Sequence, residues 1–308
     1  MNNVAIIGTG YGERVLKKCI EYSKNYHLKY ILSRKKKGTL FISNIKKIIK
    51  DKTLKLICIE TPPFTHLQLL KKFKNHKIKI LCEKPIVHNL KELELLKKLI
   101  RSYKYNLFIN HQLRHHPSLI IFKKELKKIG KVKLLKIIYN SNNISEKKNN
   151  WWFDNKLGGG HLLAIGPHLL DLLNFFNGEL KDLKKDLRYT KTYNKKIDVE
   201  FNLEGFFLNG ASFNINSSCD SKEKNIKLLI EAHGSLSSLK FENFKKIKII
   251  SNKNIKYIKF KKLKYQKDFF SNPWRIAQFH YLKKIFIQKN RLNDKKIKQS
   301  IKNLELIL

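Results

Sequence analysis

The feature that most constrains this 308-residue chain is a glycine-rich turn at its amino terminus. The apolar run Val4-Ala5-Ile6-Ile7 leads directly into Gly8-Thr9-Gly10-Tyr11-Gly12. Such a turn between a strand and a helix offers free backbone amides to a pyrophosphate, and glycine is needed where a Cβ would block the phosphate. The spacing departs from G-x-G-x-x-G, because Glu13 takes the last position and Gly12 comes one residue early. The turn predicts a dinucleotide site, with a plain tight turn as the alternative.

The first third of the chain alternates short apolar runs with stretches of helical period. This pattern is typical of a doubly wound parallel sheet, the Rossmann arrangement. We expect strands at residues 4–8, 29–33, 56–60, 78–82 and 106–110. Helices are expected at 65–73 and at 90–100, the latter behind a possible Asn89 cap.

After about residue 113 the pattern changes. A helix at 117–128 and a strand at 132–139 precede a polar loop, and from residue 199 onward strand-like runs dominate. These strands are expected at 199–208, 211–215, 226–232, 236–241, 247–250 and 255–260, followed by helices at 274–288 and 295–306. Asn209-Gly210 predicts a two-residue hairpin turn in which both residues have positive φ. Single cores stop growing near ~250–300 residues, so we expect two domains, 1–113 and 114–308.

The end of the second expected strand indicates which nicotinamide dinucleotide is preferred. A protein that selects NAD normally places Asp or Glu about 20 residues after the glycine turn. Here no acidic residue occurs between Glu21 and Asp51, and the strand ends in Ser33-Arg34. A hydroxyl and a guanidinium suit a 2′-phosphate, so we expect NADP to be preferred over NAD.

The formal net charge of +42 is typical of a nucleic-acid-binding protein, but its distribution favours another interpretation. Only seven of the 66 basic residues are arginine, and the lysines are spread along the whole chain. This fits a compositional drift better than one selected basic patch, so no specific nucleic acid is expected, although polyanion binding stays open. The field would still attract anionic substrates and cofactors, less so at high salt.

No apolar run reaches the ~18 residues of a membrane helix, and we expect a soluble, cytoplasmic protein. The cysteines are scattered, which favours buried thiols over disulfides or a metal site. His161, His168 and Asp171 would share a face of a single helix. Pro167 is expected to interrupt that helix, and nothing completes a tetrahedral ligand set, so no metal is expected.

Four motifs fall in order along the chain. They are Thr61-Pro62-Pro63-Phe64-Thr65-His66, Cys82-Glu83-Lys84-Pro85, Arg114 with Pro117, and Gly158-Gly159-Gly160 continuing through His168 to Asp171. With them the chain resembles the Gfo/Idh/MocA oxidoreductases, the family of glucose-fructose oxidoreductase and inositol dehydrogenase. The resemblance covers most of the chain.

The resemblance implies a Rossmann domain followed by an α/β domain with a large, mainly antiparallel open sheet, through which such chains often form homo-oligomers. It implies hydride transfer between a nicotinamide and a carbinol carbon of a sugar, polyol or nucleotide sugar. Lys84 and His168 are then the catalytic candidates, facing each other across the cleft. The family pattern adds Thr61, Pro62, His66 and Glu83 at the cofactor and Arg114, His168 and Asp171 at the substrate. Trp152, beside the glycine motif, is a further candidate for the substrate.

One departure from the family pattern concerns catalysis. Many members have Asp four residues before the motif histidine, where this chain has Ala164. Proton transfer would then depend on Lys84 and His168, which have suitable chemistry for removing a hydroxyl proton. The departure also keeps a non-catalytic, cofactor-binding regulator as an alternative. Trp151 and Trp152 could stack on a sugar or pack between domains, and the sequence favours neither.

Overall fold

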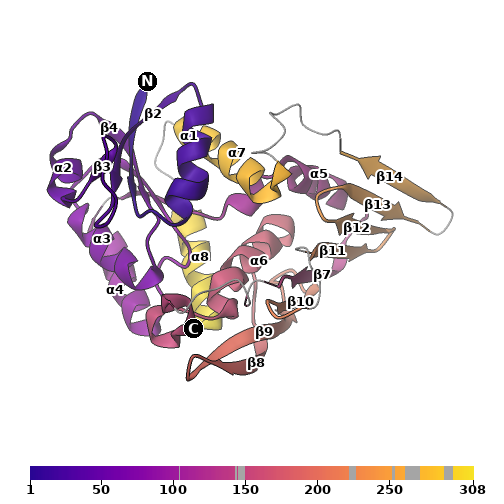
Figure 1. The fold of residues 1–308 in the computed structure, drawn as a ribbon. Coiled ribbons are helices and arrows are strands. Elements are labelled where there is room, and N and C mark those ends of the chain that lie inside the picture. The colour runs from indigo at the N-terminus through magenta and orange to yellow at the C-terminus, as the bar shows by residue number, and fades with distance from the viewer. Residues whose placement is uncertain are drawn as a thin grey trace. The chain divides into compact units, whose positions relative to one another are not determined.

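The structure is a computed structural model that describes residues 1–103, 105–142, 144, 150–221, 227–251, 254–260, 271–287 and 294–308 (Figure 1). The chain forms two compact units. The first comprises residues 1–112, 274–306 and 308, and the second comprises 113–273 and 307. The expected division placed everything after residue 113 in the second domain, and the closing helices correct it.

These closing helices are α7 (Pro273–Ile287) and α8 (Asp294–Ile307), and both pack mainly on the first unit. The Tyr26 hydroxyl donates to the carbonyl of Leu282 in α7 at 2.7 Å. Lys97 and Glu305 form an ion pair that joins α8 to an earlier helix. Such contacts between residues far apart in sequence cannot be read from periodicity, which explains the incorrect boundary.

The first unit is built on a parallel six-stranded sheet in the order β3-β2-β1-β4-β5-β6. Its strands are β1 (Asn2–Ile7), β2 (Tyr26–Leu32), β3 (Phe41–Ile42), β4 (Leu54–Ile59), β5 (Lys79–Cys82) and β6 (Asn106–Ile109). Its early helices are η1 (Gly12–Lys17), α1 (Lys18–Tyr22), α2 (Ile45–Lys50), η2 (Pro63–Thr65), α3 (His66–Lys72) and α4 (Leu90–Ser102). The sequence prediction of a Rossmann-type sheet is confirmed, while the short β3 and α2 were missed.

Local chemistry explains where these elements begin. In α4 the Asn89 side chain accepts a hydrogen bond from the Glu92 amide at 2.8 Å, so the predicted cap is confirmed. Leu93, Leu96 and Leu99 follow at helical spacing and are buried. The central strands β1 and β4 end in continuous runs of buried apolar residues, Val4 to Ile7 and Leu56 to Ile59, as expected for a sheet covered on both faces.

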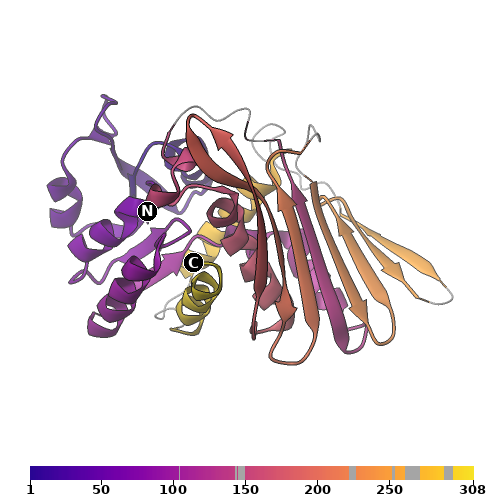
Figure 2. The same ribbon diagram turned by 90° about the horizontal axis from the view of Figure 1, so that it is seen from below.

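The second unit carries an eight-stranded sheet in the order β14-β13-β12-β11-β7-β10-β9-β8, in which only β7 and β10 are parallel neighbours. Figure 2 shows these strands side by side. They are β7 (Val132–Asn140), β8 (Lys184–Thr192), β9 (Lys195–Phe206), β10 (Ser212–Ser218), β11 (Lys227–Gly234), β12 (Ser238–Glu242), β13 (Lys246–Ile250) and β14 (Ile255–Lys259). The segment η3 (Gln112–His115) spans the boundary, with Gln112 in the first unit. The further helical segments of the second unit are α5 (Pro117–Leu126), η4 (Trp151–Phe153), η5 (Asn155–Leu157) and α6 (His161–Asn177).

Aromatic contacts hold α5 and α6 against this sheet. The Phe122 ring of α5 lies 5.1 Å from Phe176 of α6 and 5.9 Å from Phe241 of β12, both edge to face. All three rings are buried. Such pairs add to the stabilisation that burial of their apolar surface gives. The mainly antiparallel sheet agrees with the fold that the family resemblance implied.

Helix α6 corrects the expectation that Pro167 would interrupt a helix at residues 161–171, because it runs without a break from His161 to Asn177. An internal proline costs about 3 kcal/mol through its missing amide and its clash with the preceding turn. Four leucines after Pro167 are fully buried, and burial of each contributes roughly 1.5–3 kcal/mol. Packing of the helix therefore outweighs the cost of the proline.

The hairpin between β9 and β10 forms as expected, but its turn differs. Of Asn209 and Gly210, only Gly210 has a positive φ, at 84°. The Phe207 amide donates to the Ala211 carbonyl, which leaves a three-residue loop with glycine in the last position. The two-residue turn with both residues at positive φ occurs instead at Tyr193-Asn194, between the missed strand β8 and β9.

Candidate functional site

The site is built on the residues that directly follow the strands of the parallel sheet. Backbone hydrogen bonds continue the ladder one residue beyond each strand, from Gly8 to Leu32, Glu60 to Ile7, Glu83 to Ile59 and Asn110 to Cys82, at 2.8–3.3 Å. The five residues that follow β2, β1, β4, β5 and β6 therefore form one row, which we call the strand-end row: Ser33, Gly8, Glu60, Glu83 and Asn110. It lies at the carboxyl edge, where open α/β sheets bind their ligands.

The glycine turn has the three spatial properties that a phosphate-binding turn needs. Gly8 has φ of 112°, and a Cβ there would lie 2.5 Å from the Glu60 carbonyl oxygen. Gly10 is exposed, and apart from its chain neighbours no atom of the described residues lies within 4 Å of the position of a Cβ. A Cβ on Gly12 would lie 2.6 Å from Ile6 Cγ2, so this glycine permits close packing of helix on strand. Gly12 thus performs the packing role of the third glycine despite its shifted position.

The loop after β2 is organised by two side chains. Ser33 is buried, and its hydroxyl oxygen accepts from the Lys36 amide at 3.0 Å and the Lys35 amide at 3.3 Å. Lys36 pairs with Glu13 at 2.7 Å, which ties the loop to the first helix. Arg34 is exposed, and no hydrogen bond or ion pair joins it to another residue that the structure describes. Ser33 therefore shapes the loop, while the Arg34 side chain is exposed at its surface.

The loop after β4 is fixed from behind by His66. Its ring lies between two carbonyls, with Nε2 2.7 Å from the Thr61 oxygen and Nδ1 3.0 Å from the Pro85 oxygen. The side chain is fully buried, and burial lowers the pKa of His66 to about 4. His66 thus supports the loops of Thr61-Pro62 and Lys84-Pro85, and its expected place at the cofactor stays a prediction.

A chain of hydrogen bonds links the end of β5 to helix α7. Asn110 Nδ2 donates to Glu83 Oε1 at 2.6 Å and to Gln278 Oε1 at 3.0 Å. The Tyr11 hydroxyl donates to the same Gln278 oxygen at 3.2 Å and accepts from Gln112 Nε2 at 3.2 Å. This network, which we call the amide network, connects the glycine turn to the Glu83-Lys84 pair.

Sequence reasoning missed Glu60, Asn110, Gln112 and Gln278. Glu60 and Asn110 had a detectable signal, because each is a polar residue directly after an apolar strand. Gln112 follows two residues later on the same segment. Gln278 carried no local signal, since 168 residues separate it from Asn110.

Burial of acidic side chains dominates the electrostatics at the carboxyl edge of the parallel sheet. Burial raises the pKa of Glu60 well above its ordinary value, and the nearby Glu83 charge raises it further. Burial also raises the pKa of Glu83, against the lowering effects of the Lys84 charge and the Asn110 amide. The pKa of Tyr11 is raised well above its ordinary value by burial and by both glutamates, so its hydroxyl stays protonated.

In the second unit the triple glycine explains how α6 begins. Gly160 has φ of 98°, and a Cβ there would collide with the Asp198 carboxylate. That carboxylate accepts from the Leu162 amide at 2.6 Å and so caps the helix, although burial raises the pKa of Asp198. His161 Nε2 lies 2.8 Å from the Ser217 hydroxyl, away from any exposed surface. Gly160 and His161, at the start of this motif, therefore have a structural role.

Two predicted substrate residues bind each other. Arg114 Nε donates to Asp171 Oδ2 at 2.6 Å, and Nη2 bonds to the other carboxylate oxygen, which makes a two-point pair. The Asp171 side chain is 3% exposed and that of Arg114 14%. His168 lies one turn before Asp171 on α6 and is buried. The structure thus brings Arg114 and Asp171 together as a structural pair.

Trp152 lies in a hydrophobic cluster of the second unit with Phe153, Ile197, Val199 and Cys219. Its ring contacts Phe153 edge to face at 5.0 Å, and 4% of the residue is exposed. Trp151 and Ala164 pack against the same cluster. Trp152 therefore packs inside the second unit, and its contact with a substrate stays a prediction.

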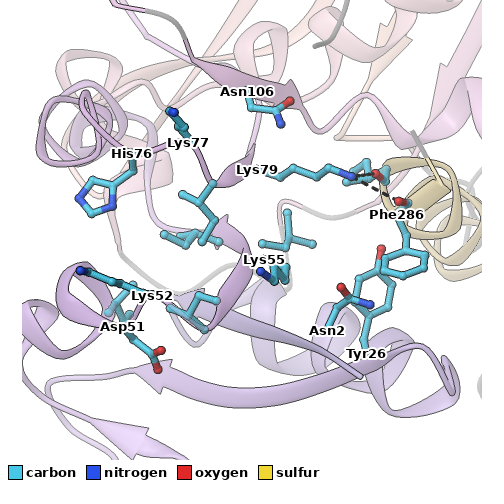
Figure 3. A pocket seen from close by; sticks show the side chains of 16 residues that line it. Asn2, Tyr26, Asp51, Lys52, Lys55, His76, Lys77, Lys79, Asn106 and Phe286 are labelled. Atoms are coloured by element: carbon cyan, nitrogen blue, oxygen red, sulfur yellow. Dashed lines mark hydrogen bonds between the residues drawn. The ribbon is translucent and has the colours of Figure 1, made fainter. Parts of the chain in front are cut away.

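A cavity of about 560 Å³ opens at the opposite edge of the parallel sheet, where β1, β4, β5 and β6 begin (Figure 3). Its labelled polar lining includes Lys52, Lys55, Lys77 and Asn106, and none of the predicted site residues. Across it, Lys79 Nζ donates to the carbonyl of Ile285 at 2.9 Å and caps the end of α7. The cavity is thus separate from the strand-end row.

Comparison with known proteins agrees with this geometry. A family model described as oxidoreductase, NAD-binding Rossmann fold, matches residues 2–111, and a model of the GFO/IDH/MocA C-terminal domain matches residues 125–240. The chain belongs to the GFO/IDH/MocA oxidoreductase family. The resemblance inferred from the motifs is thereby confirmed, and the two-part fold follows from membership.

Individual members of the family are distant. Oxidoreductase P35 of Formosa agariphila is 28% identical over 196 residues, which are 60% of this chain and 60% of that protein. Levoglucosan dehydrogenase, solved with NADH and levoglucosan, has a TM-score of 0.82 at 16% identity over 99% of this chain and 95% of its own. A putative NADPH-dependent oxidoreductase of Desulfitobacterium hafniense has a TM-score of 0.78 at 16% identity, with 99% and 93% covered. The two solved structures show that the fold is shared.

Two further findings concern ligands and membranes. Within the described part of the chain, no three His, Cys, Asp or Glu residues converge as metal ligands would. None of the helices in the described ranges has the length and apolar character needed to cross a membrane.

Proposed function

We propose that this protein is an NAD(P)-dependent oxidoreductase that acts on a hydroxyl-bearing or keto carbon of a sugar, polyol or nucleotide sugar. The observation that carries the proposal is the position of Lys84, directly after Glu83 of the strand-end row and beside the amide network. Family membership supports the hydride chemistry. The sugar class is supported by levoglucosan dehydrogenase, whose fold this chain shares and whose structure contains NADH and levoglucosan.

The residues present fit a nicotinamide dinucleotide. The exposed backbone at Gly10 and the tight turn at Gly8 would hold its pyrophosphate, since the Gly10 surface is open and the helix begins at the next turn. When bound, the cofactor supplies the hydride acceptor or donor. Asn110 and Gln112 each retain one buried side-chain oxygen without a hydrogen-bond partner among the described residues, and these could accept from a polar ligand.

Lys84 is the group we propose for proton transfer. Oxidation of an alcohol requires removal of its hydroxyl proton, and a neutral Lys84 Nζ can accept it; reduction requires the reverse. The Lys84 backbone amide donates to Glu83 Oε2 at 3.0 Å, which fixes the residue at the end of β5. His168 of α6 is proposed as the second proton-handling group, from its position in the family motif.

A preference for NADP is proposed from the loop after β2. Its exposed guanidinium, Arg34, follows a strand whose end carries no carboxylate. A 2′-phosphate accepts charge-assisted hydrogen bonds from such a group, whereas ribose hydroxyls are better bound by an acid. The Ser33 hydroxyl already accepts hydrogen bonds from two backbone amides, so Arg34 is the residue that we propose selects NADP over NAD.

A second candidate is a cofactor-binding regulator without turnover. The observation that favours it is Ala164, which packs against the Trp152 cluster where many family members have a carboxylate. The nearest acid along α6, Asp171, is engaged by Arg114. Under this alternative the dinucleotide binds, but no sugar or polyol is oxidised.

The deciding experiment follows nicotinamide absorbance while a panel of sugars, polyols and nucleotide sugars is tested with NADP and NAD. We expect turnover that Lys84→Ala lowers by about 100-fold or more, as for loss of a general base. Lys91→Ala, at an exposed position of α4, is the matched control and should act like the native protein. Dinucleotide binding without turnover on the whole panel would favour the regulator.

A further inference from the structure

The strand-end row contains two acids side by side, and only one belongs to the motif after β5. Ile59 of β4 pairs with Cys82 of β5, so Glu60 and Glu83 are neighbours one residue beyond the ladder. The Glu83 amide donates to the Ile59 carbonyl at 2.9 Å, which holds the two backbones at this level. Two neighbouring acids at matched positions repel each other when both are ionised, which is unfavourable unless one of them keeps its proton or a nearby group compensates the charge.

Glu60 is buried beneath the first helical turn. Only 5% of the residue is exposed, and its Cβ and Cγ lie 3.2 and 3.3 Å from the position that a Cβ on Gly12 would take. Among the described residues no N–H group donates to either carboxyl oxygen of Glu60. Glu83 occupies the matched position at the end of the neighbouring strand, and burial and then the charge of Glu83 raise the pKa of Glu60. An ionised Glu60 would therefore lack both water and a donor.

Glu83 has the donors that Glu60 lacks. Its Oε1 accepts from Asn110 Nδ2 at 2.6 Å and its Oε2 from the Lys84 amide at 3.0 Å. Hydrogen bonds of this kind stabilise a carboxylate, whereas desolvation without donors stabilises the protonated acid. The asymmetry of donors assigns the charge to Glu83 and the proton to Glu60.

The other titratable groups around the pair do not alter this assignment. Burial raises the pKa of Cys58 on β4, Cys82 on β5 and Tyr11 in the glycine turn, so these stay neutral. Cys19 of α1, next to Tyr11, is also kept neutral by burial, which raises its pKa. The cation that acts on the pair is Lys84, whose charge favours ionisation of Glu83. Helix α7 contributes the neutral amide of Gln278.

We propose that Glu60 and Glu83 share one proton, held on Glu60 and donated to Glu83, so that the pair presents a single negative charge beside Lys84. Glu60 is thereby a positioning residue that acts through Glu83. Its significance for catalysis rests on the proposed role of Lys84, because a second buried negative charge would hold the lysine proton more tightly. The shared proton itself depends only on the geometry of the row.

The test is the infrared spectrum of the full-length protein with and without ¹³C-labelled glutamate carboxyl groups. At about pH 8 an ordinary glutamate, with a pKa of ~4.3, is ionised, and only a protonated one shows a carboxylic C=O band. We expect a glutamate-derived C=O band in the native protein and its loss in Glu60→Gln, which keeps the shape and a donor to Glu83. Isotope labelling separates the band from any due to Asp198, whose pKa is also raised by burial.

Glu94→Gln, at an exposed position of α4, is the matched control and should keep the band. Absence of a labelled C=O band in the native protein would overturn the proposal, as would a band unchanged by Glu60→Gln. If Glu60→Gln did not fold, the native spectrum would still decide between one shared proton and two carboxylates. The spectrum requires no substrate, so its result does not depend on whether the proposed enzyme activity is found.

Discussion

Asn110 Nδ2 lies 2.6 Å from Glu83 Oε1, and this contact joins the ends of β6 and β5. The same amide group also donates to Gln278 of α7, so a residue near the carboxyl terminus takes part in the network beside Lys84. The network contains only side chains of the first unit. The geometry of the network is therefore a property of the Rossmann unit itself.

The first prediction concerns the glycine turn. Gly10→Ala should leave the melting temperature unchanged, because φ at Gly10 is not positive and, apart from its chain neighbours, the new Cβ meets no atom of the described residues within 4 Å. It should weaken NADPH binding by roughly tenfold or more, since the methyl group occupies the approach of the phosphate. Gly12→Ala is the contrasting variant and should lower the melting temperature, because its Cβ would lie 2.6 Å from Ile6 Cγ2. Fluorescence titration and thermal unfolding measure both, and unchanged binding in Gly10→Ala would argue for a plain turn.

The second prediction concerns cofactor selection. Arg34→Ala should weaken NADPH binding by about tenfold and leave NADH binding nearly unchanged, as expected for loss of a charge-assisted hydrogen bond. Lys37→Ala, which removes an exposed charge from the same loop, controls for the general electrostatic field. An unchanged ratio of NADPH to NADH affinity in Arg34→Ala would show that another group reads the ribose.

The third prediction concerns the pair of Arg114 and Asp171. Removing one partner of a buried ion pair leaves an uncompensated charge, so Arg114→Ala should lower the free energy of unfolding by about 3–5 kcal/mol. Arg188→Ala breaks an exposed pair with Glu200 on the same sheet and should cost at most about 1 kcal/mol. Urea unfolding of the two variants gives both values. Equal effects would contradict the structural role assigned to the buried pair.

The fourth prediction is a pH dependence that arises from His66. Burial lowers the pKa of His66 to about 4, below the ~6.5 of the unfolded chain. The unfolded state therefore binds more protons between these values, and stability falls as the pH is lowered through this window. The loss attributable to His66 between about pH 7 and 5 is roughly 2 kcal/mol. Urea unfolding of His66→Gln at these two pH values should show a smaller loss of unfolding free energy than that of the native protein. An equal loss in the two proteins would mean that His66 does not titrate as inferred.

The sequence predicted the parts of this molecule that depend on local pattern. The apolar runs placed β1, β2, β4, β5 and β6, and the Asn89 cap placed α4, because periodicity and capping act within a few residues. The motif residues Gly8 and Glu83 lie at strand ends, as expected. These successes required no information on tertiary contacts.

Errors arose where packing overrides local preference. Pro167 is retained inside α6 because the surrounding leucines are buried, and Gln278 enters the network from a helix distant in sequence. For Trp152 the sequence left stacking and packing equally open, and only the placed chain shows the cluster against which it packs. The partner of Asp171 likewise became evident only when α6 and Arg114 were placed.

The most direct test of the proposed function is a fluorescence titration of the purified protein with NADPH and NADH at physiological salt. We predict saturable binding of both dinucleotides, tighter for NADPH, and weakened in Gly10→Ala. Binding of neither dinucleotide, in a protein whose thermal unfolding shows it to be folded, would contradict the assignment of the glycine turn and with it the proposed oxidoreductase activity.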